Sequence, residues 1–174
     1  MSCGPFVFWG SALAIAVRTA RSGDLAAVDA VLACAYPRLL KPDYPPSVLV
    51  TALPLISRAQ PSLLASGTYY VAEDDAGQIV GAGGWTKDRA SSELGHIRHV
   101  ATDDRMTRQG VARAVMTRVF ETAQSAGIAH LLCYATRTAV PFYEAMGFAT
   151  VGSMEMTLQP GIVFPAIRME RLLD

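Results

Sequence analysis

Residues 107 to 113 read T-R-Q-G-V-A-R and stand between a stretch typical of a β-strand, residues 93–102, and one typical of a helix, residues 110–126. The first N–H groups of a helix have no partner within it and carry partial positive charge, so they suit an anion such as a diphosphate. Gly110 has no side chain and lets the backbone approach phosphate oxygens closely. The small side chain of Ala112 also permits this approach. The stretch therefore predicts a phosphate-binding turn at the start of the helix.

The charges around this turn also favour an anion. Arg108 and Arg113 place cationic side chains at its rim, and Arg105 is a third candidate. The first turn of the helix lacks Asp and Glu, which are usually welcome at a helix N-terminus. An ordinary helix entry with solvated arginines explains this segment equally well, so a second signal is needed.

On either side of the turn, β-branched and aromatic runs predict strands, and apolar residues at helical spacing predict helices. Asp24 is a candidate N-cap of the first helix, and Pro37 belongs to the proline-rich loop that follows. Pro54 lies inside the second helix, which we expect to be kinked or split there. The glycine-rich residues 81–85 predict close approach of another group. The strands are expected at residues 14–19, 68–72, 78–85, 93–102, 128–135, 148–158 and 163–172, and the later helices at 47–58, 110–126 and 139–146.

The order of elements, β-α-α-β-β-β-α-β-α-β-β, predicts an α/β (α+β) fold with a mixed, mostly antiparallel sheet of about six or seven strands and helices on both faces. A chain of 174 residues suits one domain, which we place at residues 13–174. Residues 1–12 are apolar, but they lack an early Lys or Arg and contain Gly and Pro. They therefore suit neither a signal peptide nor a membrane span, and we expect a poorly ordered extension.

The composition argues against several other classes of protein. Fifteen Lys and Arg balance fifteen Asp and Glu, whereas nucleic-acid-binding domains usually carry a basic surplus. The three cysteines, Cys3, Cys34 and Cys133, have no metal-like spacing, and their odd number favours reduced thiols in a cytoplasmic protein. We therefore expect no nucleic-acid partner, no membrane partner and no metal.

The second signal is residues 136–148, T-R-T-A-V-P-F-Y-E-A-M-G-F. Together with the turn, this segment resembles the GNAT superfamily of acyl-CoA-dependent N-acyltransferases, whose motifs read Q/R-x-x-G-x-G/A and N-x-x-A-x-x-F-Y-x-x-x-G-F. Thr107 stands where the family has Gln or Arg, and Thr136 stands where it has Asn. The residues that match the second motif are Ala139, Phe142, Tyr143, Gly147 and Phe148.

The resemblance implies the GNAT fold, acetyl-CoA (coenzyme A) as cosubstrate and, by family habit, a homodimer. The pyrophosphate is expected on the N–H groups of the turn, and the pantetheine arm along the backbone of residues 99–101. Such a contact requires that strand to splay from its parallel neighbour at 128–135. The implied cofactor-binding residues are His99, Val100, Ala101, Arg108, Gln109, Gly110, Val111, Ala112, Arg113, Thr136, Phe142 and Tyr143.

The resemblance also implies a general acid. Family members use a tyrosine at the position of Tyr143 to protonate the leaving thiolate, and we expect the helix N-terminus to lower its pKa. The alternative is a tyrosine that only packs in the core. A backbone N–H such as that of Ala101 is expected to polarise the thioester carbonyl. Cys133 offers a covalent route, but it lies in the apolar run L-L-C-Y, where a thiol is usually inert.

The general base is chosen among Glu93, His96 and His99, with a water chain as the alternative, and His99 is our candidate. Strand alternation places His96 and Arg98 on one face and Ile97 and His99 on the other, unless a bulge intervenes. Tyr69, Tyr70, Trp85 and residues 163–165 are candidates both for an acceptor pocket and for the core.

The sequence thus predicts an enzyme that transfers the acetyl group directly to a primary amine of a small molecule or peptide in a ternary complex. The alternatives are a longer acyl group, a non-catalytic CoA-binding regulatory module and a doubly wound nucleotide-binding protein. The sequence does not contain the glycine-rich motifs that a doubly wound nucleotide-binding protein would have. No motif identifies the acceptor amine. We expect it to be selected by residues 36–61 and by the last hairpin.

Overall fold

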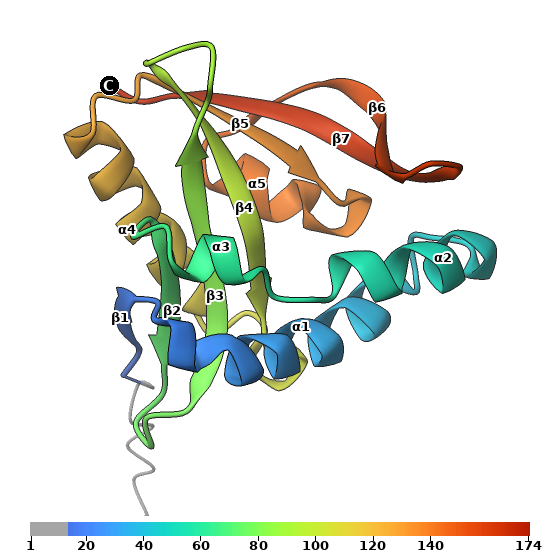
Figure 1. Cartoon of the computed structure of the whole chain (residues 1–174), viewed down its shortest axis with the longest axis horizontal. Helices are drawn as coiled ribbons and strands as arrows, with labels where there is room; N and C mark the ends of the chain where they lie inside the picture. Colours follow the sequence, from blue (N-terminus) through green and yellow to red (C-terminus); the bar gives the residue numbers. More distant parts are fainter. Residues whose placement is uncertain (1–13) are drawn as a thin grey trace, which may run out of the picture.

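The computed structural model describes residues 14–174, so the extension expected at residues 1–12, including Cys3, lies outside the described residues. The described part forms one seven-stranded sheet with helices on both faces (Figure 1). The strands are β1 (Ala16–Thr19), β2 (Tyr69–Glu73), β3 (Ile79–Lys87), β4 (Leu94–Thr102), β5 (His130–Ala135), β6 (Ala149–Gln159) and β7 (Ile162–Leu172). The helices are α1 (Leu25–Leu40), α2 (Pro46–Ile56), α3 (Pro61–Leu64), α4 (Val111–Ser125) and α5 (Val140–Ala145), with short 3-10 turns η1 (Ser22–Asp24), η2 (Asp104–Met106) and η3 (Arg137–Ala139).

The sheet has the order β1-β2-β3-β4-β5-β7-β6, and β4 and β5 are its one parallel pair. Their ladder runs only from Leu94–His96 opposite His130–Leu132. Beyond it, the second half of β4 has no partner on β5, so the two strands diverge toward their carboxyl ends. The mixed sheet and the splayed parallel strands predicted from the sequence are both confirmed.

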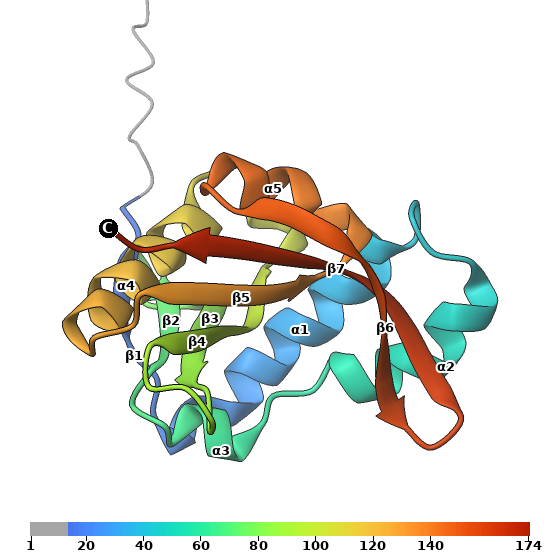
Figure 2. The same cartoon turned by 90° about the horizontal axis from the view of Figure 1, so that it is seen from above.

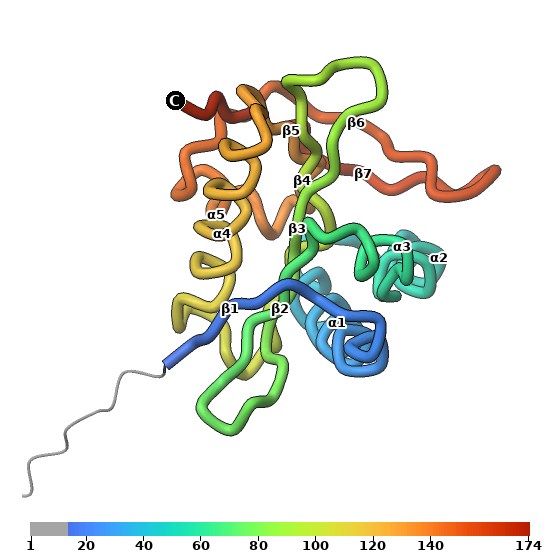
Figure 3. The backbone as a smooth tube through the Cα atoms, turned by 60° about the vertical axis from the view of Figure 1, so that its left-hand side comes forward, coloured from blue at the N-terminus to red at the C-terminus, as the bar shows by residue number. Residues whose placement is uncertain are grey.

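Helices cover both faces of the sheet. In Figure 3, α4 and α5 lie on one side of the strands, and α1 and α3 lie on the other. The side of α4 and α5 holds a core that includes Met116, Leu131, Tyr143 and Phe148. The side of α1 and α3 holds a second core, built around Val28, Leu32, Tyr69 and Val71.

Helix α2 lies apart from both of these cores. It packs beside the β6–β7 hairpin at one end of the molecule, as Figure 2 shows from above. Tyr44, just before α2, stacks on Phe164 of β7 with 4.7 Å between ring centroids. Its hydroxyl donates to the carbonyl oxygen of Pro165 (2.8 Å), so the hairpin, α2 and the end of α1 form one unit.

The expectation that Pro37 belongs to a loop is wrong, because helix α1 continues through it to Leu40. Of the two outcomes expected at Pro54, a kink or a split, the split does not occur, because α2 continues through Pro54. Pro37 is exposed, whereas Ala35 and Leu40 on either side of it are buried. This packing outweighs the one helical hydrogen bond that a proline cannot donate. The break predicted near Pro54 comes later, where residues 57–60 separate α2 from the unexpected short helix α3.

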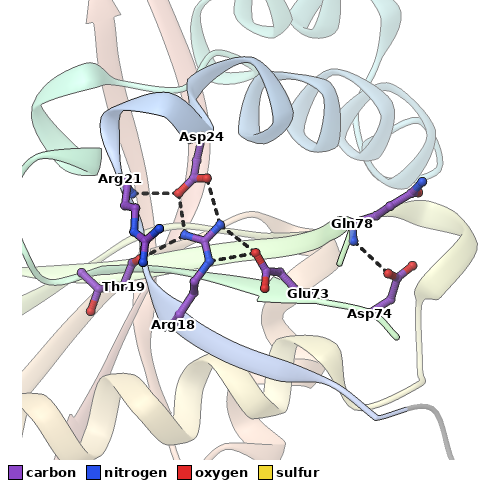
Figure 4. Close-up of polar contacts among 7 residues, drawn as sticks. All are labelled: Arg18, Thr19, Arg21, Asp24, Glu73, Asp74 and Gln78. Carbon is purple, nitrogen blue, oxygen red and sulfur yellow. Dashed lines mark hydrogen bonds and ion pairs between the residues drawn. The ribbon is translucent and has the colours of Figure 1, made fainter. Parts of the chain in front are cut away.

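Asp24 precedes α1 as expected, but its side chain does not cap that helix. Its carboxylate accepts two hydrogen bonds from the Arg18 guanidinium (2.8 and 2.9 Å) and one from the N–H of Arg21 (2.7 Å), as Figure 4 shows. Arg18 also donates to Glu73 at 2.8 Å. These contacts hold the pKa of the Asp24 carboxyl below its usual value and tie the edge strand β1 to η1 and β2.

The glycines of β3 permit close packing, as predicted. A Cβ atom on Gly81 would lie 2.5 Å from Cγ1 of Val111, the first residue of α4, and one on Gly84 would lie 2.3 Å from the carbonyl oxygen of Thr68. The first turn of α4 therefore rests directly on the middle of the sheet, which fixes the position of the T-R-Q-G-V-A-R turn.

Candidate functional site

A cavity of about 770 Å³ follows the splayed half of β4. Its walls come from α1, the end of β4, the start of α4, and the η3–α5 segment. Of the residues expected to bind the cofactor, all except His99 and Gln109 line it. Residues that the sequence did not single out also contribute, among them Tyr36 and Leu39 of α1, Thr102, Met106, Thr138 and Pro141.

The turn before α4 leaves several backbone N–H groups outside the helical hydrogen-bond ladder. Gly110 has a φ of 84° and Arg108 a φ of 62°, a region that L-residues rarely adopt. The first helical hydrogen bond runs from the N–H of Ala114 to the carbonyl oxygen of Gly110 (2.9 Å). The N–H groups of Val111, Ala112 and Arg113 therefore precede the ladder and are available to a ligand. No acidic residue lies in this first turn.

The arginines around the turn divide into two groups. Arg108 and Arg113 are exposed, and within residues 14–174 neither is recorded in an ion pair. Arg105 is paired within the protein, because its guanidinium donates to both carboxylate oxygens of Asp103 (3.1 and 2.8 Å). The suggestion that Arg105 assists the anion site is therefore not supported.

β4 contains a bulge where the pantetheine arm is expected. His99 has a φ of 43°, and the β3–β4 register shifts between Ala82 and Gly84. Neither His99 nor Val100 has a register partner on β3 or β5. Within residues 14–174, two buried polar side-chain atoms lack a hydrogen-bond partner, and both belong to this stretch: Nδ1 of His99 and Oγ1 of Thr102. Strain and unsatisfied polar atoms often mark functional sites.

The bulge changes which residues share a face. His99 does not lie with Ile97 in the core but lines a second cavity, of about 570 Å³, with His96 and Arg98. The alternation expected of a regular strand stops at this position, because the bulge that would interrupt it is present. Its Nε2 lies 3.3 Å from Nε2 of Gln60, and burial, followed by the charge of Arg98, lowers the pKa of His99.

Tyr143 is buried and belongs to the wall of the larger cavity. Its ring packs edge-on against Phe142 and Phe148, with centroids 5.2 and 5.4 Å apart. Burial is the main cause that raises the pKa of its hydroxyl well above the usual value, and the neighbouring Cys133 adds to this. The expected lowering by the helix N-terminus is therefore wrong, since α5 is short and Tyr143 is its fourth residue.

Cys133 does not support a covalent route. The residue is buried in β5, and burial raises the pKa of its thiol to about 12. The nucleophilic thiolate is then essentially unpopulated near neutral pH. Tyr36 of α1 has a hydroxyl whose pKa burial likewise raises to about 12, so both tyrosines in the wall of the cavity hold protonated hydroxyls.

Comparison with known proteins agrees with this geometry. A family model described as "Acetyltransferase (GNAT) domain" matches residues 43–171. The chain belongs to the GNAT acetyltransferase family. No curated protein matches it in sequence.

Solved GNAT structures share the fold at low sequence identity. Rv2747 from Mycobacterium tuberculosis, solved with CoA and NLQ, is 22% identical, with a TM-score of 0.61 over 91% of this chain and 99% of that one. A GCN5-related N-acetyltransferase from Rhodopseudomonas palustris is 16% identical, with a TM-score of 0.74 over 98% and 100% of the two chains. The structure of yncA from Salmonella typhimurium, solved with acetyl-CoA, is 16% identical, with a TM-score of 0.66 over 92% of this chain and 95% of that one.

The two departures from the GNAT motifs have local roles here. Thr107 donates its hydroxyl hydrogen to the carbonyl oxygen of Asp104 (3.1 Å). Thr136 accepts a hydrogen bond from the N–H of Ala139 (3.3 Å) and so caps η3. Both threonines line the cavity while stabilising the turns that carry it.

The aromatic candidates for an acceptor pocket belong to the GNAT core instead. Tyr69, Tyr70 and Trp85 are all buried. Tyr70 and Trp85 donate to the same hydroxyl, that of Thr122 on α4 (2.8 and 3.0 Å). Across residues 14–174 no cluster of His, Cys, Asp or Glu could hold a metal, and no helix there is long and apolar enough to cross a membrane.

Proposed function

We propose that this GNAT protein transfers the acetyl group of acetyl-CoA directly to the primary amine of a small molecule or peptide in a ternary complex. The observation that carries the proposal is one cavity lined both by the turn at Arg108–Arg113 and by Tyr143, along the half of β4 that has no partner on β5. Known relatives of the same fold were solved with CoA or acetyl-CoA, which supports the choice of cosubstrate.

Each part of the cavity suits one part of acetyl-CoA. The N–H groups of Gly110 to Arg113, with the free side chains of Arg108 and Arg113, would hold the pyrophosphate. The backbone of His99 to Ala101, which has no partner on β5, would bind the pantetheine arm as an added strand on that side. Phe142 and Thr136 would line the arm on its other side, and the N–H of Ala101 would polarise the thioester carbonyl.

The reaction requires few protein groups. The amine nitrogen attacks the thioester carbonyl carbon, the carbon–sulfur bond breaks, and the sulfur leaves with the electron pair. Tyr143 would donate a hydrogen bond and then a proton to this sulfur, and the amine would lose a proton to a base. Burial keeps the Tyr143 hydroxyl protonated, so it carries the proton that the leaving sulfur needs.

His99 is the base that the geometry favours. Its lowered pKa leaves a neutral imidazole at pH 7, and it lies on the bulge beside the expected thioester. His96 is held by Asp88 through its Nε2 (2.8 Å). Glu93 precedes His99 by six residues of β-strand, which corresponds to about 20 Å. Direct transfer is further supported by the inert state of Cys133.

Thiol release from acetyl-CoA, measured against a panel of amines, tests this function. Acetylated product is expected with at least one amine, together with one free CoA thiol per product. Binding of CoA without release in the presence of any amine would favour a regulatory module instead. Competition between acetyl-CoA and longer acyl-CoA species in the same assay decides the acyl group.

A further inference from the structure

The second cavity lies on the α3 side of the sheet, where β3 ends and β4 begins. It shares the bulge with the larger cavity, because His99 lines one and the next residue, Val100, lines the other. A volume of about 570 Å³ is within the range of about 300–1,000 Å³ typical of small-molecule sites. A ligand in this cavity would therefore lie next to the position expected for the thioester.

The charges of this cavity are strongly one-sided. Lys87, Arg89 and Arg98 contribute three cationic side chains, and among the described residues Asp88 is the one carboxylate in its wall. The carboxylate of Asp88 already has partners within the protein. It pairs with His96 and accepts hydrogen bonds from the N–H groups of Ala90 (2.8 Å) and Ser91 (3.0 Å). The cavity therefore presents positive charge that its own residues do not neutralise.

Arg98 is the cation best placed to recognise an anion. The side chain is half-buried, and its Nε donates to the hydroxyl of Thr86 (2.8 Å), which fixes the plane of the guanidinium. Within residues 14–174 no carboxylate pairs with it, and its two terminal nitrogens are recorded in no hydrogen bond. Burial lowers the pKa of Arg98, in keeping with a guanidinium that no carboxylate pairs with. A guanidinium held in this way suits the two oxygens of a carboxylate.

We propose, resting on the acetyl-transfer function above, that this cavity is the acceptor pocket and that it selects amines that carry a carboxylate, with Arg98 as the anchor and Lys87 and Arg89 at the rim. A carboxylate on Arg98 would hold the amine beside His99, the next residue of β4. The acceptor is then a small amino acid or a related amino carboxylate, rather than a polyamine, whose positive charges the same side chains would repel.

The test compares matched acceptors in the thiol-release assay: free amino acids, the same amino acids as C-terminal amides, and 2-aminoethyl phosphate. The wild type is expected to prefer the best free amino acid over its amide by at least about tenfold in kcat/KM, because a site built for a charged group rejects the analogue that lacks it. Arg98→Gln is expected to remove most of this preference, through a higher KM for the free amino acid. Besides burial, Arg98 also lowers the pKa of His99, but this effect acts on the acid and the amide alike and cancels in their ratio.

Two further variants control for folding and for general charge. Arg98→Lys keeps the charge but not the paired donors, so it should retain part of the preference. Arg118→Gln removes an exposed cation from α4, on the other face of the sheet, and should leave the preference intact. Equal turnover of acids and amides by the wild type, or an unchanged preference in Arg98→Gln, would overturn the proposal while leaving acetyl transfer in place. Faster turnover of 2-aminoethyl phosphate would overturn the choice of a carboxylate.

Failure of the transfer function itself is recognised separately. If no amine is turned over, calorimetry with CoA-loaded protein compares N-acetylglycine with N-acetylglycinamide, which differ only in the carboxylate. Tighter binding of the acid by the wild type, lost in Arg98→Gln, would uphold the anion pocket without any turnover. Equal binding of the two compounds would refute it.

Discussion

The hydroxyl of Tyr69 donates a hydrogen bond of 3.0 Å to the carbonyl oxygen of His99. Tyr69 is buried on β2, and His99 has the positive φ that opens the bulge in β4. The carbonyl of His99 has no register partner on a neighbouring strand, so this side chain satisfies it. The bulge on which both cavities meet is thus held from two strands away.

Tyr69→Phe should loosen the bulge. The substitution leaves a buried carbonyl without its donor, at a cost of about 1–3 kcal/mol in unfolding free energy. We expect a weaker Kd for CoA and a lower kcat, both measured on folded protein. Tyr70→Phe is the matched control, because its hydroxyl bonds to Thr122 instead. Equal loss of activity in both variants would show that the effect is general destabilisation.

Gly110→Glu should abolish CoA binding without unfolding the domain. The residue has a φ of 84°, and no atom lies within 4 Å of an added Cβ, so the side chain has space. The new carboxylate would face the pyrophosphate. Gly127→Glu, at the other end of α4, has a φ of 79° and equal space, so both variants carry the same backbone strain, about 1–2 kcal/mol. Calorimetry that found CoA affinity retained in Gly110→Glu would move the pyrophosphate elsewhere.

Tyr143→Phe should lower kcat by about 100-fold, the lower end of the contribution of a general acid, with little change in the KM for acetyl-CoA. Steady-state thiol release measures both constants. The phenyl ring keeps the edge-on contacts with Phe142 and Phe148, so the fold should persist. Turnover equal to that of the wild type would reduce Tyr143 to a packing role.

The pH profile should report on His99. Its pKa lies below the ordinary value of 6.5 because the imidazole is buried beside Arg98. As the pH falls through this lowered pKa, His99 becomes protonated and can no longer accept the proton of the amine. An acidic limb of kcat/KM is therefore expected below pH 6.5. In His99→Gln this limb should vanish and the plateau should fall, while the limb from the amine itself remains. A limb that survives in the variant would assign the base elsewhere.

The sequence predicted the regular parts of this molecule well, because they depend on local signals. Gly110 and Gly127 mark the two ends of α4, and both have a positive φ, which glycine adopts readily. The hairpin of β2 and β3 and the close packing at Gly81 follow from turn chemistry and missing side chains in the same way.

The remaining features depend on contacts between distant residues. The path of α1 through Pro37 depends on buried neighbours, and the pKa of Tyr143 on burial beside β5. The turn of His99 away from the core depends on a bulge that no local pattern marks. Tyr36 belongs to residues 36–61, which are expected to select the amine, yet α1 brings it to the wall of the larger cavity.

The most direct test of the account is the acetylation of an amine by the purified protein, measured as CoA thiol released and as acetylated product by mass spectrometry, for the wild type, Gly110→Glu and Gly127→Glu. The account predicts equal amounts of thiol and N-acetyl product from the wild type and Gly127→Glu, and neither from Gly110→Glu. Product formed equally by Gly110→Glu, or no product from the wild type with any amine, would contradict it.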